Sequence, residues 1–147
     1  MGKQPGASGH WAVPHTADMQ VEAWSPTVAG CIGEAVRAVV EGFADTSGAA
    51  IVGDREYAIK AASNEDLLVS VLDEVVYRMD AYGEIPLDVD VGEIRSVGDG
   101  RGLSVRFRMA DTGTVVPVGA VPKAVSLYDL QLQCGAGGWT CRVTLDV

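Results

Sequence analysis

The amino-acid sequence predicts one domain of the α+β class, in which two helices pack on a largely antiparallel sheet. Two segments carry apolar residues at helical spacing, and the segments between and after them alternate apolar and polar residues as strands do. Short Gly-rich stretches separate the alternating segments of the C-terminal half, which is typical of hairpins. The expected order is β-α-β-β-α-β-β-β-β, which favours antiparallel pairing over a doubly wound parallel sheet. A chain of 147 residues suits one such domain.

Residues 1–10 are expected to form a flexible tail, and residues 11–147 the single domain. Gly, Ser, Pro and polar residues dominate the tail, which leaves too little apolar area to offset the entropy of ordering it. The first strand is predicted over residues 19–24, where apolar and polar residues alternate.

The first helix is predicted to start at Ser25 and Pro26 and to end near Gly42. A Ser hydroxyl can accept a hydrogen bond from a free amide at a helix start, and Pro at the first helical position has no amide to lose. The apolar face expected for this helix comprises Val28, Ile32, Ala35, Val36, Val39, Val40 and Phe43.

Two short strands are expected next, over residues 49–52 and 57–61. Gly53 and Asp54 lie between them and are typical turn residues, so the two strands are predicted to form a hairpin.

The second helix has the clearest signals in the chain. Ser63 or Asn64 can cap its start, the acidic residues Glu65 and Asp66 suit its positive end, and Gly83 ends it. Its apolar face comprises Leu67, Leu68, Val71, Leu72, Val75, Val76 and Met79. Because Glu74 lies one turn before Arg78, the two are expected to form a surface ion pair.

Four strands are predicted to complete the domain, over residues 87–91, 103–109, 124–134 and 139–147. Gly98, Asp99, Gly100 and Gly102 supply a turn before the second of these strands, and residues 135–138 supply one between the last two.

The three cysteines are expected to be reduced and to lie in or near the core. In the last hairpin, Cys134 would oppose Trp139, and Cys141 would then oppose Leu132, so the two thiols would miss each other. An odd number of cysteines without CxxC spacing also argues against a disulfide framework, a disulfide-linked partner or a structural zinc site. Cys31 lies at the edge of the first apolar helix face.

The net charge of the chain limits the classes of ligand that it can bind. Eleven basic and twenty acidic residues give a formal net charge of −9, which disfavours direct binding to nucleic acid. An acidic surface instead suits cations or a basic protein partner. No apolar stretch is long enough to span a membrane and no apolar leader follows Lys3, so we expect a cytoplasmic protein.

The common catalytic motifs are missing from the sequence. It contains no GxSxG, HExxH, P-loop or GxGxxG pattern. Asp88 and Asp90 would share the wet face of a strand, so they are interpreted as solvated side chains. The composition and motifs therefore do not predict an enzyme.

Two acidic residues near the two ends of the domain are more informative. Asp18 directly precedes the first strand, and Asp146 ends the last one, followed by Val147 and its α-carboxylate. If these strands end side by side, three carboxylates converge, and they repel one another unless a hard cation lies among them. Ca²⁺, with Mg²⁺ or Mn²⁺ as alternatives, prefers such oxygen ligands. Solvated acids at the chain ends are the alternative.

Three patches, taken in this order and spacing, make the chain resemble the archease family. The resemblance extends over nearly everything after the tail. The patches are His15, Thr16, Ala17 and Asp18; residues 65–77; and Pro122, Lys123, Ala124, Val125 and Ser126 followed by residues 139–147.

The resemblance implies an accessory protein that is not itself an enzyme. Archeases assist RtcB-type RNA ligases in tRNA splicing by promoting guanylylation of the ligase and its multiple turnover. The family's metal-binding pattern falls on Asp18, Asp146 and the carboxylate of Val147. The resemblance also implies that Lys123 and His15 contact the partner or its nucleotide. The sequence departs from the family at Tyr128, where a His commonly stands.

Two other functions stay open at this point. A small metal-independent hydrolase could use His15 and Asp18 as base and acid, but no nucleophile or oxyanion loop accompanies the pair. A purely structural protein-interaction domain would bind no metal.

Overall fold

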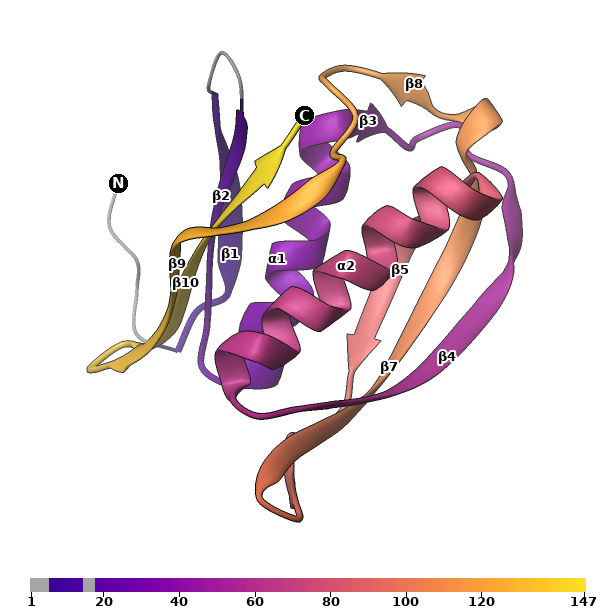
Figure 1. Cartoon of the computed structure of the whole chain (residues 1–147). Helices are drawn as coiled ribbons and strands as arrows, with labels where there is room; N and C mark the ends of the chain where they lie inside the picture. Colours follow the sequence, from indigo (N-terminus) through magenta and orange to yellow (C-terminus); the bar gives the residue numbers. More distant parts are fainter. Residues whose placement is uncertain (1–5, 15–17) are drawn as a thin grey trace.

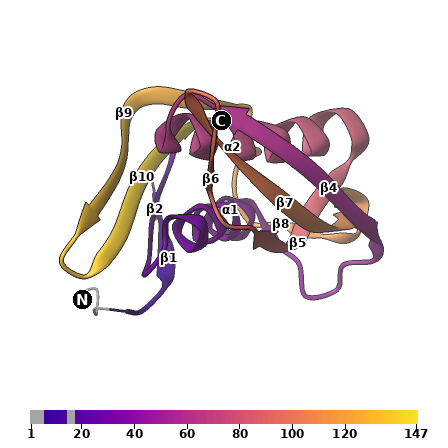
Figure 2. The same ribbon diagram turned by 90° about the horizontal axis from the view of Figure 1, so that it is seen from below.

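The computed structural model describes residues 6–14 and 18–147 and has the predicted α+β architecture. The helices α1 (Val28–Phe43) and α2 (Asn64–Tyr82) lie between two antiparallel sheets, as the two views in Figures 1 and 2 show. Among the described residues, no helix is long and apolar enough to cross a membrane.

The first sheet joins both ends of the described chain. Its strand order is β1-β2-β10-β9, and all neighbours are antiparallel. The strands are β1 (Gly9–Pro14), β2 (Asp18–Ser25), β9 (Ala124–Gly135) and β10 (Gly138–Asp146). The last strand of the chain is therefore an interior strand of this sheet.

The second sheet is built from the middle of the chain. Its strand order is β4-β7-β5, and β6 also pairs with β7. The strands are β4 (Ile51–Ala61), β5 (Glu84–Val91), β6 (Arg95–Val97) and β7 (Gly100–Asp111). The short strands β3 (Ala44–Asp45) and β8 (Val116–Pro117) pair separately, and a 3₁₀ turn spans Thr112–Thr114.

The hydrophobic core fills the space between the sheets and the helices. The side chains of β2, β7 and β10 that face the helices are buried, and so are the predicted faces of α1 and α2, except for the half-buried Val28 at the start of α1. The largest fully buried side chains include Phe107, Ile32, Leu67, Leu72 and Leu145. Burial of these apolar surfaces supplies most of the favourable free energy of folding.

Several local predictions are confirmed. Ser63 caps α2 by accepting a hydrogen bond from the Asp66 amide at 3.1 Å, and Gly83 ends the helix in the left-handed conformation at φ 62°. The register of the last hairpin pairs Cys134 with Trp139 and Cys141 with Leu132. All three cysteines are free.

The predicted hairpin at Gly53 is wrong. Residues 51–61 form the single strand β4, and the register with β7 shifts between Ile51 and Gly53. Gly53 has φ 141°, a conformation that other residues avoid. The glycine therefore creates a bulge within one strand instead of a turn between two.

The start of α1 also differs from the prediction. Thr27, and not Ser25, is the N-cap, because its hydroxyl accepts from the Gly30 amide at 3.0 Å. Ser25 is the buried last residue of β2. Its hydroxyl instead accepts hydrogen bonds from the Thr27 amide at 3.5 Å and from the Ser8 hydroxyl at 3.0 Å, so it lies just before the helix.

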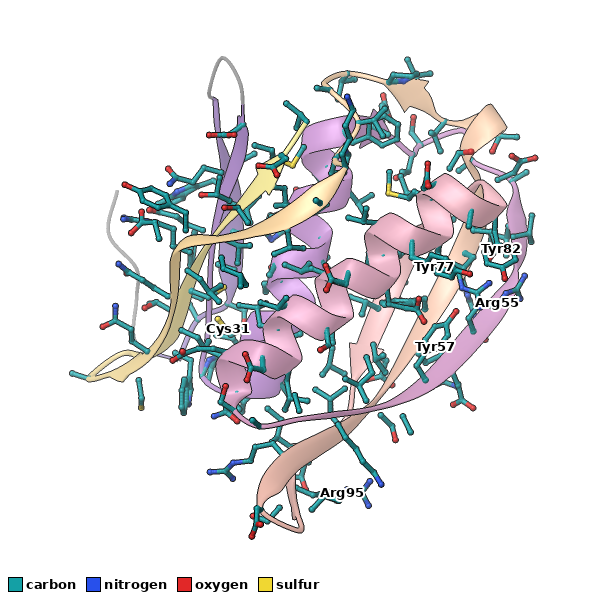
Figure 3. All side chains as sticks on the ribbon, viewed as in Figure 1. Cys31, Arg55, Tyr57, Tyr77, Tyr82 and Arg95 are labelled. Carbon is teal, nitrogen blue, oxygen red and sulfur yellow. The ribbon has the colours of Figure 1, made fainter. Side chains whose placement is uncertain are left out.

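Two side chains lie elsewhere than expected. Cys134 is exposed beside the β9–β10 turn, whereas Cys31 and Cys141 are buried. Arg78 does not pair with Glu74. Its guanidinium lies 4.4 Å from the ring centroid of Tyr82 and 5.3 Å from that of Tyr57. Figure 3 shows Tyr57 on β4 and Tyr82 at the end of α2, and the attraction between the guanidinium and these two rings favours this position of Arg78.

The sequence did not indicate β1, β3, β6 or β8. β1 begins at Gly9 and so includes the last two residues of the segment 1–10 that was expected to be a tail. The division of the chain at residues 10 and 11 stays a prediction.

Candidate functional site

The ends of β2 and β10 lie side by side, as the carboxylate hypothesis requires. Asp18 is the first residue of β2, Asp146 is the last of β10, and the two are paired directly in the antiparallel register. The C-terminus lies at this end of the molecule, and the β6–β7 turn lies at the opposite end (Figure 1). The chain thus brings together two acidic residues that are far apart in sequence.

Strand geometry places both carboxylates on one face of the sheet. Met19 and Leu145, the next residues inward along each strand, are buried against the helices, so Asp18 and Asp146 point to the outer face. Directly opposed residues in an antiparallel pair have Cβ atoms about 4.5–5.5 Å apart, and like charges at that spacing destabilise the pair.

No cation of the protein neutralises this pair within residues 6–14 and 18–147. There the side chains of Asp18 and Asp146 have no hydrogen bond or ion pair. Arg142, on the same outer face, is already bound to Glu22 at 3.1 Å and to Asp129 at 3.5 Å. The two carboxylates therefore form a local concentration of negative oxygen at the edge of the fold.

Lys123 lies beside the acidic pair because β9 is held against β10 there. The Lys123 amide donates a 2.7 Å hydrogen bond to the backbone carbonyl of Asp146. Pro122, the preceding residue, is buried, whereas the Lys123 side chain is exposed. The backbone at Lys123 is thus anchored while its ammonium group stays available to a binding partner.

Val147 follows the acidic pair and is itself attached to the core. Its half-buried side chain packs against the core cluster, which restricts the backbone next to Asp146. His15 lies outside the described residues. Across residues 6–14 and 18–147, no three His, Cys, Asp or Glu side chains are grouped so that they could hold a metal ion.

Strand β9 contains a large bulge that the sequence did not predict. Ser126 pairs with Thr144, and Gln131 pairs with Arg142, so residues 127–130 lie opposite Val143 alone. Asp129 has φ 58°, the only positive φ found among the non-Gly residues that the structure describes. Leu127 and Tyr128 are consequently 70% and 82% exposed. Only the Asp in this run could have signalled the feature, because Asp tolerates the left-handed conformation.

The other acidic residues considered from the sequence are solvated and paired. Asp88 and Asp90 are exposed on the outer face of β5, where they lie 3.1 Å from Arg37 and 3.4 Å from Arg106. A surface hollow of about 260 Å³ lies over them, and Asp54 and Arg108 line it as well. Arginines neutralise the charges of these acidic residues, whereas the carboxylates of Asp18 and Asp146 have no such partner among the described residues.

The family of the chain follows from its similarity to known proteins. The model of the Archease protein family matches residues 11–147. The probable archease proteins of two Mycobacterium tuberculosis strains are 49% identical over 146 residues, which cover 99% of this chain and 79% of each relative. The chain belongs to the archease family. The archease of Archaeoglobus fulgidus is a more distant member, 28% identical over 138 residues, which cover 92% of this chain and 96% of the relative.

Solved structures support the archease fold. The solution structure of a Methanobacterium thermoautotrophicum protein superposes with a TM-score of 0.78 at 24% identity and covers 95% of this chain and 99% of its own. The crystal structure of a Thermotoga maritima archease, described as a possible chaperone, gives 0.59 at 17% identity and covers 92% and 94%. At these identities the similarity shows the fold alone.

Proposed function

We propose that this archease is a metal-binding accessory protein that activates an RtcB-type RNA ligase in tRNA splicing. It promotes guanylylation and multiple turnover of the ligase and performs no catalysis of its own. The observation that carries the proposal is the direct pairing of Asp18 with Asp146, beside the anchored backbone of Lys123. Family membership supplies the ligase as the partner.

The donor chemistry of this end of the molecule suits a hard cation. Asp18 and Asp146 offer carboxylate oxygens on one face and have no protein counter-ion among the described residues. The proposed third ligand is the α-carboxylate of Val147. Oxygen ligands of this kind favour Ca²⁺, with Mg²⁺ or Mn²⁺ as alternatives. A bound cation would supply positive charge that stabilises nucleotide phosphates during transfer to the ligase.

The protein's own residues would position this end against the ligase. β10 fixes the two acidic residues through its pairing with β2, and the β9 backbone holds Lys123 next to them. The exposed ammonium group of Lys123 would contact a phosphate or an acidic residue of the ligase, and His15 is proposed to act with it.

The charge of the chain favours the ligase over the RNA as its direct partner. A net charge of −9 complements the basic surface that an RNA-binding ligase must carry. We also propose that the protein works in the cytoplasm, where the free thiols of its three cysteines would persist.

Guanylylation of the purified ligase, measured with and without this protein, tests the proposal. We expect stimulation that depends on a divalent cation and that is lost in Asp18→Asn and Asp146→Asn. The matched control is Asp99→Asn, which removes one exposed negative charge from the β6–β7 turn at the opposite end of the molecule. A lack of stimulation by the wild-type protein over a range of metal concentrations would contradict the activator role.

Two further measurements separate the alternatives. Calorimetric titration with Ca²⁺, Mg²⁺ and Mn²⁺ should detect binding; no binding of any of them would favour a purely structural interaction domain. A His15/Asp18 hydrolase would turn over a small substrate without the ligase, and its rate would show an inflection with pH at about 6.5.

A further inference from the structure

His10 connects the edge strand β1 to the helix behind it. In the β1–β2 register His10 pairs with Ala23, whose side chain is buried, so the imidazole points inward toward α1. The neighbouring Trp11 points the other way, and its indole N–H donates to Glu22 at 2.8 Å on the outer face. The His10 side chain is 14% exposed.

Each ring nitrogen of His10 faces a different carboxylate of α1. Nδ1 lies 2.5 Å from Oε2 of Glu34, and Nε2 lies 2.5 Å from Oε2 of Glu41. A neutral imidazole has only one N–H, so it can donate to one of these carboxylates but not to both. Both contacts are hydrogen bonds only when the imidazole carries its second proton.

The charged groups around the ring are few. From α1, Glu34 and Glu41 touch it, and Arg37 lies 3.5 Å from the other oxygen of Glu34. From β5, Asp88 lies 3.1 Å from Arg37 and pairs with that guanidinium. From β2, the partner of His10 is the apolar Ala23. The nearest charges therefore favour the imidazolium.

Opposing effects act on the pKa of His10. Burial is the largest single effect and lowers the pKa, but the hydrogen bonds and the charges of Glu34 and Glu41 together outweigh it and raise the pKa above 6.5. Because the pKa is raised in the folded state, the stabilisation is fully present below about 6.5. It is lost as the pH rises through the raised value.

We propose that His10 is a protonation-dependent clip that fastens β1 to α1. The imidazolium binds the strand to both carboxylates, and loss of its proton removes one of the two hydrogen bonds. Among the described strands β1 is at the edge of its sheet and pairs with β2, so the His10 contact adds a link to α1 that the backbone ladder does not supply. The clip does not depend on the activator role proposed above.

An NMR titration of the full-length protein tests the clip. The sequence has two histidines, and the signal that disappears in His10→Gln identifies His10. Glu34→Gln and Glu41→Gln should each lower its proton affinity by about two- to fivefold. Glu34→Gln should have the larger effect, because Glu34 is 17% exposed and Glu41 is 66% exposed. Glu56→Gln, on the outer face of the opposite sheet, is the charge-matched control and should leave the titration unchanged.

Hydrogen exchange provides a second readout that does not depend on any variant folding. Protection factors of the β1 amides in the wild-type protein should fall by about two- to fivefold between pH 5.5 and 8.5, whereas those of α2 should not. A His10 pKa at or below 6.5, a titration insensitive to both Gln variants, or equal β1 protection at the two pH values would each overturn the proposal.

Discussion

At the scale of single residues, the pairing of Asp18 with Asp146 predicts a cost in stability where no cation is bound. Their side chains oppose each other on one face, and the nearby Arg142 is engaged with Glu22. Asp146→Asn should therefore stabilise the metal-free protein by about 0.2–1 kcal/mol while abolishing metal binding. Urea unfolding in a chelator and calorimetry measure the two effects. Asp99→Asn should change neither of them, and a loss of stability in Asp146→Asn would argue against repulsion.

The α-carboxylate proposed as a ligand can be tested by lengthening the chain. An extension after Val147 converts that carboxylate into an amide and should weaken divalent-cation binding, while the thermal midpoint stays near that of the unextended protein. The matched control carries the same extension at the N-terminus and should bind the cation normally. Equal metal affinity in both proteins would remove Val147 from the ligand set.

At the scale of secondary-structure elements, Arg78 joins α2 to two strands. Its guanidinium packs on Tyr57 of β4 and on Tyr82, and it lies 3.9 Å from Glu84 of β5. Arg78→Met keeps the apolar stem and removes these interactions, so it should lower the free energy of unfolding by about 1–2 kcal/mol. Arg95→Met, at an exposed position of β6, is the control and should change stability little. If Arg78→Met and the wild-type protein had equal free energies of unfolding in urea, Arg78 would not contribute to the packing of α2 against the two strands.

Under the proposed function, the β9 bulge is expected to contact the ligase. It exposes Leu127 and Tyr128 on the same strand that begins beside Lys123 and Asp146. Leu127→Ser combined with Tyr128→Ser should weaken stimulation of guanylylation and leave cation affinity unchanged, since neither residue belongs to the acidic pair. Val116→Ser is the control, because Val116 is another exposed apolar residue, 62% exposed, that lies on β8. If the double variant lost both cation binding and stimulation of guanylylation, the bulge would be needed for the cation site at Asp18 and Asp146 and not for contact with the ligase.

The elements with local signals were predictable from the sequence, and those fixed by distant partners were not. α2 has its own cap, apolar face and terminating Gly83, so its bounds follow from nearby residues. β1 contains Gly9 and Pro14 and lacks clear alternation; pairing with β2 and the contact of His10 with α1 determine it. The β9 bulge similarly depends on where β10 pairs.

At the scale of the whole molecule, the acidic pair could be predicted only as a hypothesis about topology. Asp18 and Asp146 stand at strand ends in the sequence, but their meeting depends on β10 lying next to β2. The importance of Lys123 came from the family resemblance, and its exposure by itself does not indicate a function. The His10 contacts with Glu34 and Glu41 span 24 and 31 residues, and no local pattern announces them.

The net charge of −9 predicts how the protein would associate with the proposed ligase partner. Attraction to a basic surface speeds encounter at low ionic strength and is screened by salt. We expect the association rate constant to fall at least about tenfold between 50 and 500 mM NaCl, with a smaller change in the dissociation rate constant. Surface plasmon resonance measures both constants. An association rate constant that is independent of salt would contradict electrostatic steering.

The interior place of β10 in its sheet has a consequence for synthesis on the ribosome. β2 is synthesised early, but one of its two neighbours in the sheet is β10, the last strand of the domain. β2 therefore cannot complete its hydrogen bonds until nearly the whole domain has been made. α2 and the sheet formed by β4, β5 and β7 have no such delay. The nascent chain therefore carries an unsatisfied strand edge until β10 has been made, and such edges make incompletely folded chains prone to aggregation.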